Sequence, residues 1–196
     1  MSLRTIDRYG ARAYTPSMSL AGMRSTQPGQ GPAAPEEGAR SFDHLEFRRT
    51  MGRFPTGVTV VTMVGPDGQA YGVTVNAFMS VSLEPPLVAV SLGKAARAHP
   101  TLAASERFGI SVLSCEQAHL SDRFAGRLAP TGEDPFVPFE GFPVVDGAVA
   151  HVLCRMHSRC EAGDHTIFIG EVEALRSFPG DPLVFHRGRY CAVEER

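Results

Sequence analysis

Short apolar runs, each followed closely by turn-forming residues, are the feature that most restricts how this chain can fold. Val58–Val64 is dense in β-branched residues and therefore predicts a strand. The turn signal Gly65–Gly68 follows it, and Ala70–Val75 again has strand character, so the three segments predict a hairpin. Because no long helices alternate with such runs, a doubly wound parallel sheet is disfavoured and a mostly antiparallel β-barrel or sandwich is expected.

The rest of the chain follows the same pattern and brings the expected total to about seven strands with few, short helices. The other predicted strands are Leu87–Leu92, Phe108–Leu113, Val149–Arg159, His165–Leu175 and a final hairpin of Pro182–His186 and Arg189–Val193. Short helices are predicted at Thr101–Ser105 and Ser114–Ala125, and Ala129–Gly141 is expected to be an irregular, Pro-rich loop.

A further helix is predicted just before the first strand. Ser41 is its expected N-cap, accepting from the backbone N–H of His44, and Pro55-Thr56-Gly57 ends it. Its apolar residues fall close to helical spacing, at Phe42, Leu45, Phe47, Met51 and Phe54.

Length and charge limit the domain organisation and the kinds of partner. A chain of 196 residues fits one domain, and 19 basic against 21 acidic residues give no reason to expect nucleic acid or a membrane surface as a partner. No run approaches the roughly 18 apolar residues that would span a bilayer. Residues 1–40 are expected to be a disordered extension, because Gln27–Gly38 is rich in Pro and Gly. No signal peptide is expected, because Met1–Gly38 lacks a continuous apolar run. The folded domain is expected at residues 41–196.

Cysteine and histidine positions favour structural roles. The four cysteines, Cys115, Cys154, Cys160 and Cys191, have no metal-binding spacing and are expected to be reduced, mostly buried thiols of a cytoplasmic protein. His151 and His157 lie six residues apart in a predicted strand and could share a face, but no further ligands accompany them, so no metal site is predicted.

The segment Gly72–Val90 is unusual because polar side chains alternate with apolar ones. Thr74, Asn76, Ser80 and Ser82 would point to one face of an extended chain. A row of neutral donors suits a polar, planar ligand or a phosphate. The same pattern also fits a strand with one solvated face, and the residues alone leave both interpretations open.

Four segments, in order along the chain, resemble the motifs of the short-chain flavin reductases, the reductase partners of two-component flavin-dependent monooxygenases. The clearest is Thr74–Val88, which contains Ala77-Phe78 followed by Ser80-Val81-Ser82-Leu83-Glu84-Pro85-Pro86-Leu87. The other three are Phe54–Thr62, Gly163–Val172 with its Gly-Asp-His start, and Asp181–Tyr190. The resemblance covers roughly Phe42–Val193.

This resemblance implies an FMN-binding split β-barrel, a few short helices and a homodimer. It implies that flavin binds along Thr74, Val75, Asn76, Ala77, Ser80, Val81, Ser82 and Leu83, with Ser80 and Ser82 at the ribityl–phosphate end. Ser91, Lys94 and Arg97 would add phosphate or adenylate contacts, although Lys94–His99 lacks the hydroxyls that relatives often carry there. Gly163, Asp164 and His165 would face the nicotinamide, with Arg189 and Tyr190 in the same region.

The function implied is hydride transfer from NADH or NADPH to FMN or FAD, with reduced flavin supplied to a partner monooxygenase. His165 and Asp164 are the implied catalytic residues, and the cofactors supply the chemistry while the protein supplies position and electrostatics. Two alternatives are left open: a flavin- or haem-binding split-barrel protein without turnover, and an oxidase like those that act on pyridoxamine phosphate. The second would need more basic phosphate ligands than Lys94 and Arg97 provide.

Overall fold

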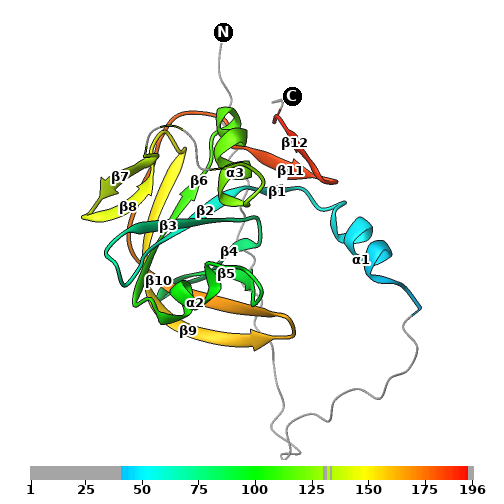
Figure 1. The fold of residues 1–196 in the computed structure, drawn as a ribbon, viewed down its shortest axis with the longest axis horizontal. Coiled ribbons are helices and arrows are strands. Elements are labelled where there is room, and N and C mark those ends of the chain that lie inside the picture. Colours follow the sequence, from blue (N-terminus) through cyan, green and yellow to red (C-terminus); the bar gives the residue numbers. More distant parts are fainter. Residues whose placement is uncertain (1–40, 130–131, 133, 194–196) are drawn as a thin grey trace, which may run out of the picture. The chain divides into compact units, whose positions relative to one another are not determined.

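An antiparallel seven-stranded sheet, in the order β3-β2-β6-β9-β10-β5-β4, is the frame of the protein (Figure 1). We describe it in a computed structural model, which describes residues 41–129, 132 and 134–193. The strands of the sheet are β2 (Thr59–Val64), β3 (Ala70–Val75), β4 (Phe78–Leu83), β5 (Pro86–Gly93), β6 (Arg107–Val112), β9 (Ala150–Ala162) and β10 (His165–Ser177). The prediction of a mainly antiparallel β-protein is confirmed, whereas the expectation for residues 1–40 lies outside the described residues.

The sheet closes on itself because its two edge strands are neighbours in the sequence. β3 and β4 form opposite edges, yet only Asn76 and Ala77 connect them. Two linking residues span at most about 11 Å, so the edges must come together and the sheet must curl into a barrel with a narrow split. One further hydrogen bond, from Ser91 N–H to the Ala77 carbonyl at 3.0 Å, holds the linker against β5. The segment that resembles a flavin motif therefore lies at the split.

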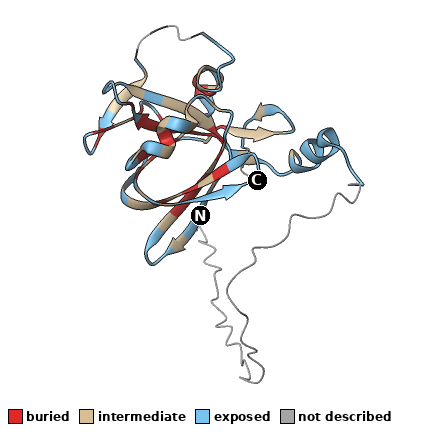
Figure 2. Cartoon of the chain, turned by 60° about the horizontal axis from the view of Figure 1, so that its bottom comes forward, coloured by how far each residue is buried: buried red, intermediate tan, exposed pale blue. Residues whose placement is uncertain are grey.

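The barrel interior is filled by large apolar side chains that alternate along the strands. Phe108, Ile110, Cys154 and Phe168 are fully buried there, together with Met63. The short helix α2 (His99–Ala104) adds Leu102 to the same core. Figure 2 shows the buried residues gathered along the barrel strands. The predicted strands form because each buries one apolar face in this common interior.

Two smaller cores flank the barrel. In one, Val58, Leu113 and Leu183 pack with residues of α3 (Ala118–Phe124), which follows the short 3₁₀ helix η1 (Cys115–Gln117). The small sheet β1 (Thr56–Gly57), β11 (Val184–His186) and β12 (Arg189–Cys191) lies beside it. The expected final hairpin is confirmed: Arg187 and Gly188, with φ of 53° and 81°, form its two-residue turn.

The segment Ala129–Gly141 is not a simple loop, and this prediction was wrong. Phe136–Phe139 forms β7, which pairs with β8 (Phe142–Val145) across Glu140-Gly141. Both turn residues have positive φ, as two-residue hairpin turns require. The hairpin forms because Phe139 and Phe142 are buried together against the barrel strands.

Helix α1 (His44–Met51) forms where predicted, but its N-cap differs and its apolar residues stay exposed. Asp43, not Ser41, is the N-cap, and its carboxylate accepts from the N–H of Glu46 at 2.7 Å. No residue of α1 is buried, and Figure 2 shows the helix as exposed along its length. The exposed apolar side chains of this segment are Phe42, Leu45, Phe47, Met51 and Phe54.

Three of the four cysteines are exposed, which corrects the expectation of mostly buried thiols. Only Cys154 lies in the core, where burial raises the pKa of its thiol to about 12. The shared face expected for His151 and His157 is also wrong. His157 is the extra residue of a β-bulge and is exposed, whereas His151 is buried, with Nε2 2.8 Å from the Val145 carbonyl. In the described residues no helix is long and apolar enough to cross a membrane, and no group of acidic, His and Cys side chains could hold a metal.

Candidate functional site

A cleft of about 820 Å³ runs over the outer surface of β5 and β10 beside the split in the barrel. Its floor comes from the strands and from the linker between β3 and β4, and its wall comes from α1, the segment after it, and the β11–β12 hairpin. The residues that line it are Phe47, Arg48, Met51, Gly52, Phe54, Thr56, Asn76, Ala77, Phe78, Met79, Ala89, Val90, Ser91, His165, Ile167, Phe185 and Arg187.

The floor is flat because small residues occupy the outward positions of β5. Val88, Val90 and Leu92 point into the core, so the alternation of the strand leaves Ala89, Ser91 and Gly93 on the outer face. Ser91 pairs with Ile167 of β10 in the strand register. A floor of this kind gives apolar contact and one hydroxyl to a flat ligand without side chains that block it.

His165 stands at one end of this floor. It pairs with Gly93 across the strands, and its imidazole lies over that residue: a Cβ built on Gly93 would lie 3.6 Å from Nε2, an ordinary van der Waals distance. His165 Nδ1 lies 2.9 Å from Asp164 Oδ1. The neutral ring then donates through Nδ1 to the carboxylate and presents Nε2 as an acceptor.

Asp164 is held by its neighbours as well as by its own turn. The hydrogen bond from His165 is the main cause that lowers the pKa of Asp164. The Asp164 carbonyl accepts from Lys94 N–H at 2.9 Å, and Gly163 supplies the positive φ of 63° that the turn needs. The Gly-Asp-His turn therefore fixes the imidazole at the cleft.

A smaller pocket of about 160 Å³ adjoins the cleft at Asn76, which lines both. Thr74 Oγ1 donates to the Ser121 carbonyl at 2.7 Å, and the Tyr190 hydroxyl lies 2.8 Å from Asp122 Oδ1 and 2.9 Å from Ser121 Oγ. Burial raises the pKa of Tyr190, so its hydroxyl stays protonated at neutral pH. Three of the residues that the sequence singled out, Thr74, Asn76 and Tyr190, thus meet in one place.

The expected single row of Thr74, Asn76, Ser80 and Ser82 is not formed. The chain changes strands at Asn76-Ala77, and a β-bulge in β4 then places Ser80 opposite Val88 but Ser82 opposite Leu87. Directly paired residues share a face, so the two serines lie on opposite faces. Ser80 and Ser82 do not line the cleft, and neither do Val75, Val81 and Leu83.

The cationic candidates are separated from one another. Lys94 forms an ion pair with Glu161, which lowers the pKa of that carboxyl. Arg97 does not line the cleft, and its guanidinium lies 3.7 Å from the position of a Cβ built on Gly126. Arg189 lines a separate hollow with His186, Arg187 and Cys191. The residues that sequence reasoning did not assign to the site include Met79, Phe185 and Arg187, together with Phe47, Met51 and Phe54, whose helical spacing was visible but whose position over the cleft was not.

Comparisons with known protein families, sequences and structures all match flavin reductases. The family model for the flavin reductase like domain matches residues 51–194. The NADH-dependent FAD reductase of Streptomyces globisporus is 42% identical over 81% of this chain and 90% of its own length. The NADH-linked FMN reductase SmoA of Agrobacterium fabrum is 46% identical over 74% of this chain and 83% of its own length. The solved styrene monooxygenase flavin reductase of Pseudomonas putida is 36% identical, with a TM-score of 0.71 over 76% of this chain and 99% of that one.

Proposed function

This chain belongs to the flavin reductase family, and from that premise we propose that it transfers hydride from NADH to FMN or FAD. One observation of the structure carries the proposal: a flat, mostly apolar floor ends at a histidine whose orientation is set by a carboxylate. The relatives quoted above are NADH-dependent reductases of FAD and of FMN, which supports NADH over NADPH as the donor.

The residues present fit a flavin ring. Ala89, Ser91 and Ile167 offer a level surface, and Asn76 and Thr56 place amide and hydroxyl groups at its margin. Flat heteroaromatic ligands need this combination of apolar faces and a polar edge. When bound, flavin supplies the acceptor for a hydride, and the side chains supply binding and orientation.

His165 and Asp164 are proposed to position the nicotinamide over this floor. The Asp164 carboxylate fixes the imidazole tautomer, so Nε2 faces the cleft as an acceptor for the carboxamide N–H of the nicotinamide. Tyr190, Thr74 and Asn76 are proposed to bind the polar edge of the flavin, because they meet in the adjoining pocket. Ser91 is proposed as a hydroxyl contact from the floor.

We further propose that two copies of the chain form a dimer through α1. The large apolar side chains of this segment are 45–75% exposed, and helices keep such a stripe only where something covers it. Reductase components of two-component oxygenases include the styrene monooxygenase reductase, which supports a monooxygenase as the consumer of reduced flavin here. NADH use together with four unpaired thiols supports the cytoplasm as its place.

Steady-state spectroscopy tests the reaction directly. Purified protein is mixed with NADH and either FMN or FAD, and loss of the nicotinamide absorbance is followed with and without flavin. We expect oxidation that depends on the flavin, with NADPH less effective than NADH. If neither nicotinamide is oxidised with either flavin, the proposed activity is wrong.

Light scattering after size-exclusion chromatography tests the dimer. Leu45→Asp puts a charge on the apolar stripe of α1, whereas Leu175→Asp puts one on another exposed leucine, in β10. We expect the wild type and Leu175→Asp to have the mass of two chains and Leu45→Asp to shift toward one. A wild type with the mass of a single chain contradicts the dimer.

A further inference from the structure

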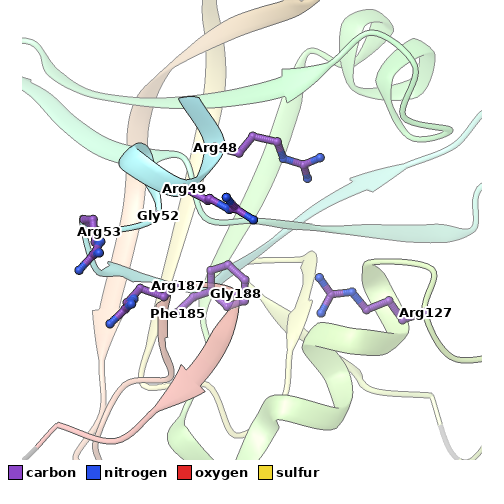
Figure 3. Close-up of a pocket in the computed structure, with 8 residues that line it drawn as sticks. All are labelled: Arg48, Arg49, Gly52, Arg53, Arg127, Phe185, Arg187 and Gly188. Atoms are coloured by element: carbon purple, nitrogen blue, oxygen red, sulfur yellow. The ribbon is translucent and has the colours of Figure 1, made fainter. Parts of the chain in front are cut away.

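A second hollow, of about 560 Å³, adjoins the cleft and is lined by five arginines and no acidic residue. Figure 3 shows these side chains arriving from three separate segments around the Phe185 ring. Its lining is Arg48, Arg49, Gly52 and Arg53 from α1 and its end, Arg127 from the loop after α3, and Phe185, Arg187 and Gly188 from the β11–β12 hairpin. We call this hollow the arginine basin.

The basin is built by backbone contacts that bring distant segments together. Arg187 N–H donates to the Gly52 carbonyl at 2.9 Å, so the end of α1 rests on the turn of the hairpin. The two segments are in close contact there: a Cβ built on Gly52 would lie 3.7 Å from the Arg187 Cα, an ordinary van der Waals distance. β1 pairs with β11 through Thr56 and Phe185, which fixes the same junction from the other side.

Most of these cations are not neutralised within the chain. In residues 41–129, 132 and 134–193, no ion pair or hydrogen bond joins Arg48, Arg49, Arg53 or Arg187 to an acidic side chain, and only Arg127 has one, to Asp122 at 3.0 Å. Like charges gathered in one concavity repel one another and focus a positive potential on it. In a protein whose formal net charge is −2, such a concentration calls for an anionic ligand.

The basin and the cleft are continuous, and this limits the kind of anion. Arg48, Gly52, Phe185 and Arg187 line both. The volume exceeds what one phosphate group would fill and lies in the range of small-molecule sites. Guanidinium forks bind phosphate oxygens in pairs and also stack on flat rings, and the Phe185 ring adds an aromatic surface at the junction.

We propose that the arginine basin binds the adenosine diphosphate half of a dinucleotide whose other ring lies in the cleft. FAD and NADH both carry this group, so the chemistry is shared between the two substrates. The inference rests on the proposed function for the identity of the ring in the cleft, but not for the binding of the diphosphate. It also assigns the phosphate contacts to α1 and the hairpin, in contrast to Lys94, whose charge is already paired with Glu161.

Calorimetric titration with ADP, FAD, FMN and NAD⁺ at low ionic strength tests the proposal on the full chain. Arg49→Gln/Arg53→Gln removes two charges that line the basin but not the cleft, and Arg127→Gln removes one from a different element. Arg155→Gln/Arg159→Gln is the matched control, since it removes two exposed arginines of β9 that line neither hollow.

We expect ADP to bind the wild type and the control with the same affinity. Both basin variants should bind ADP at least about tenfold more weakly, because each loses a charge-assisted contact. In Arg49→Gln/Arg53→Gln, FMN affinity should fall less than FAD affinity, because FMN carries only one of the two phosphates of FAD and lacks the adenosine. Weaker FAD binding with unchanged NAD⁺ binding assigns the basin to the flavin dinucleotide. Weaker NAD⁺ binding with unchanged FAD binding assigns it to the nicotinamide dinucleotide. Either result supports the proposal.

Three results would overturn the proposal: no ADP binding to the wild type, unchanged ADP affinity in both basin variants, or, where FAD affinity falls, an equal fall in FMN affinity. The last would mean that the basin holds only the phosphate that FMN shares with FAD, and not the adenosine. Failure of the reductase activity is seen separately, because ADP binding needs no turnover: ADP binding without NADH oxidation would remove only the proposed reaction.

Discussion

The two sides of the cleft are built in opposite ways. Its floor belongs to β5 and β10, which pair over seven residues and cover the buried Phe168 and Val90. Its wall, α1, has no buried residue, and its C-terminal end is anchored to the hairpin by the Arg187-to-Gly52 hydrogen bond. Regions with few buried contacts open at low free energy, whereas core strands open only with global unfolding.

The rigid floor therefore holds the proposed catalytic histidine, whereas the less constrained wall carries most of the positive charge. The floor positions His165 with the stiffness of the barrel, and the wall brings four of the five arginine-basin cations with α1 and the hairpin turn. A rigid floor keeps a reacting ring in place, because small displacements cost reaction rate. A less constrained wall would suit the entry and release of the dinucleotide proposed to bind there.

The largest expected contrast is in stability. Phe168→Ala empties a fully buried site in the floor and should lower the free energy of unfolding by about 3–5 kcal/mol. Phe54→Ala makes the same substitution in the wall, where the ring is 75% exposed within one chain. Made together with Leu45→Asp, which is expected to separate the proposed dimer, it should change chain stability by less than about 1 kcal/mol. Urea unfolding followed by circular dichroism measures both, and equal losses would contradict the contrast between floor and wall.

The next effect is on catalysis. His165→Ala should lower kcat/KM for NADH by about 100-fold, because it removes the group proposed to position the nicotinamide. His157→Ala, an exposed histidine on β9, is the control and should keep wild-type kinetics. Steady-state rates with NADH varied at saturating flavin measure both variants, together with their melting temperatures. Unchanged kinetics in His165→Ala would remove His165 from the site.

Tyr190→Phe should have a smaller effect, at the point where the hairpin meets α3. Loss of its hydrogen bonds to Asp122 and Ser121 should cost about 1 kcal/mol of stability. Because burial raises the pKa of Tyr190 above 10, the folded state keeps a proton that the unfolded state loses, so stability falls as the pH rises above 10. Comparison of urea midpoints at pH 8 and above pH 10 should show a smaller decline in Tyr190→Phe.

The smallest perturbation is chemical labelling of thiols at neutral pH. Cys115, Cys160 and Cys191 are exposed and should react with a disulfide reagent in the native protein. Cys154 should react only after denaturation, since it is buried in the core and its pKa is about 12. Mass spectrometry counts the labels: three in the native state and four after unfolding are expected. Rapid native labelling of Cys154 would show that the core beneath the floor opens easily.

Local sequence patterns identified most strands because β-branched runs and glycine turns act over a few residues. Val58–Val64 and the Arg187-Gly188 hairpin form where predicted. The β7–β8 hairpin was missed because Pro135 and Pro138 suggested a loop, although Phe139-Glu140-Gly141-Phe142 is a two-residue turn between apolar residues. The predicted polar row from Thr74 to Ser82 does not form, because a bulge at Val81 places Ser80 and Ser82 on opposite faces of β4. No local sequence pattern predicts such a bulge.

By itself, the sequence determined the class of fold and the family, since strand propensity, turn chemistry and the motifs from Ala77 to Leu87 and Gly163 to His165 are contiguous in the chain. Only the tertiary structure decided where the cleft and the arginine basin lie. Arg48, Arg127 and Arg187 stand far apart in sequence, and they meet because barrel closure, the Gly52–Arg187 contact and β1–β11 pairing fold three separate segments onto one surface. Such convergence depends on non-local contacts, which no local pattern encodes.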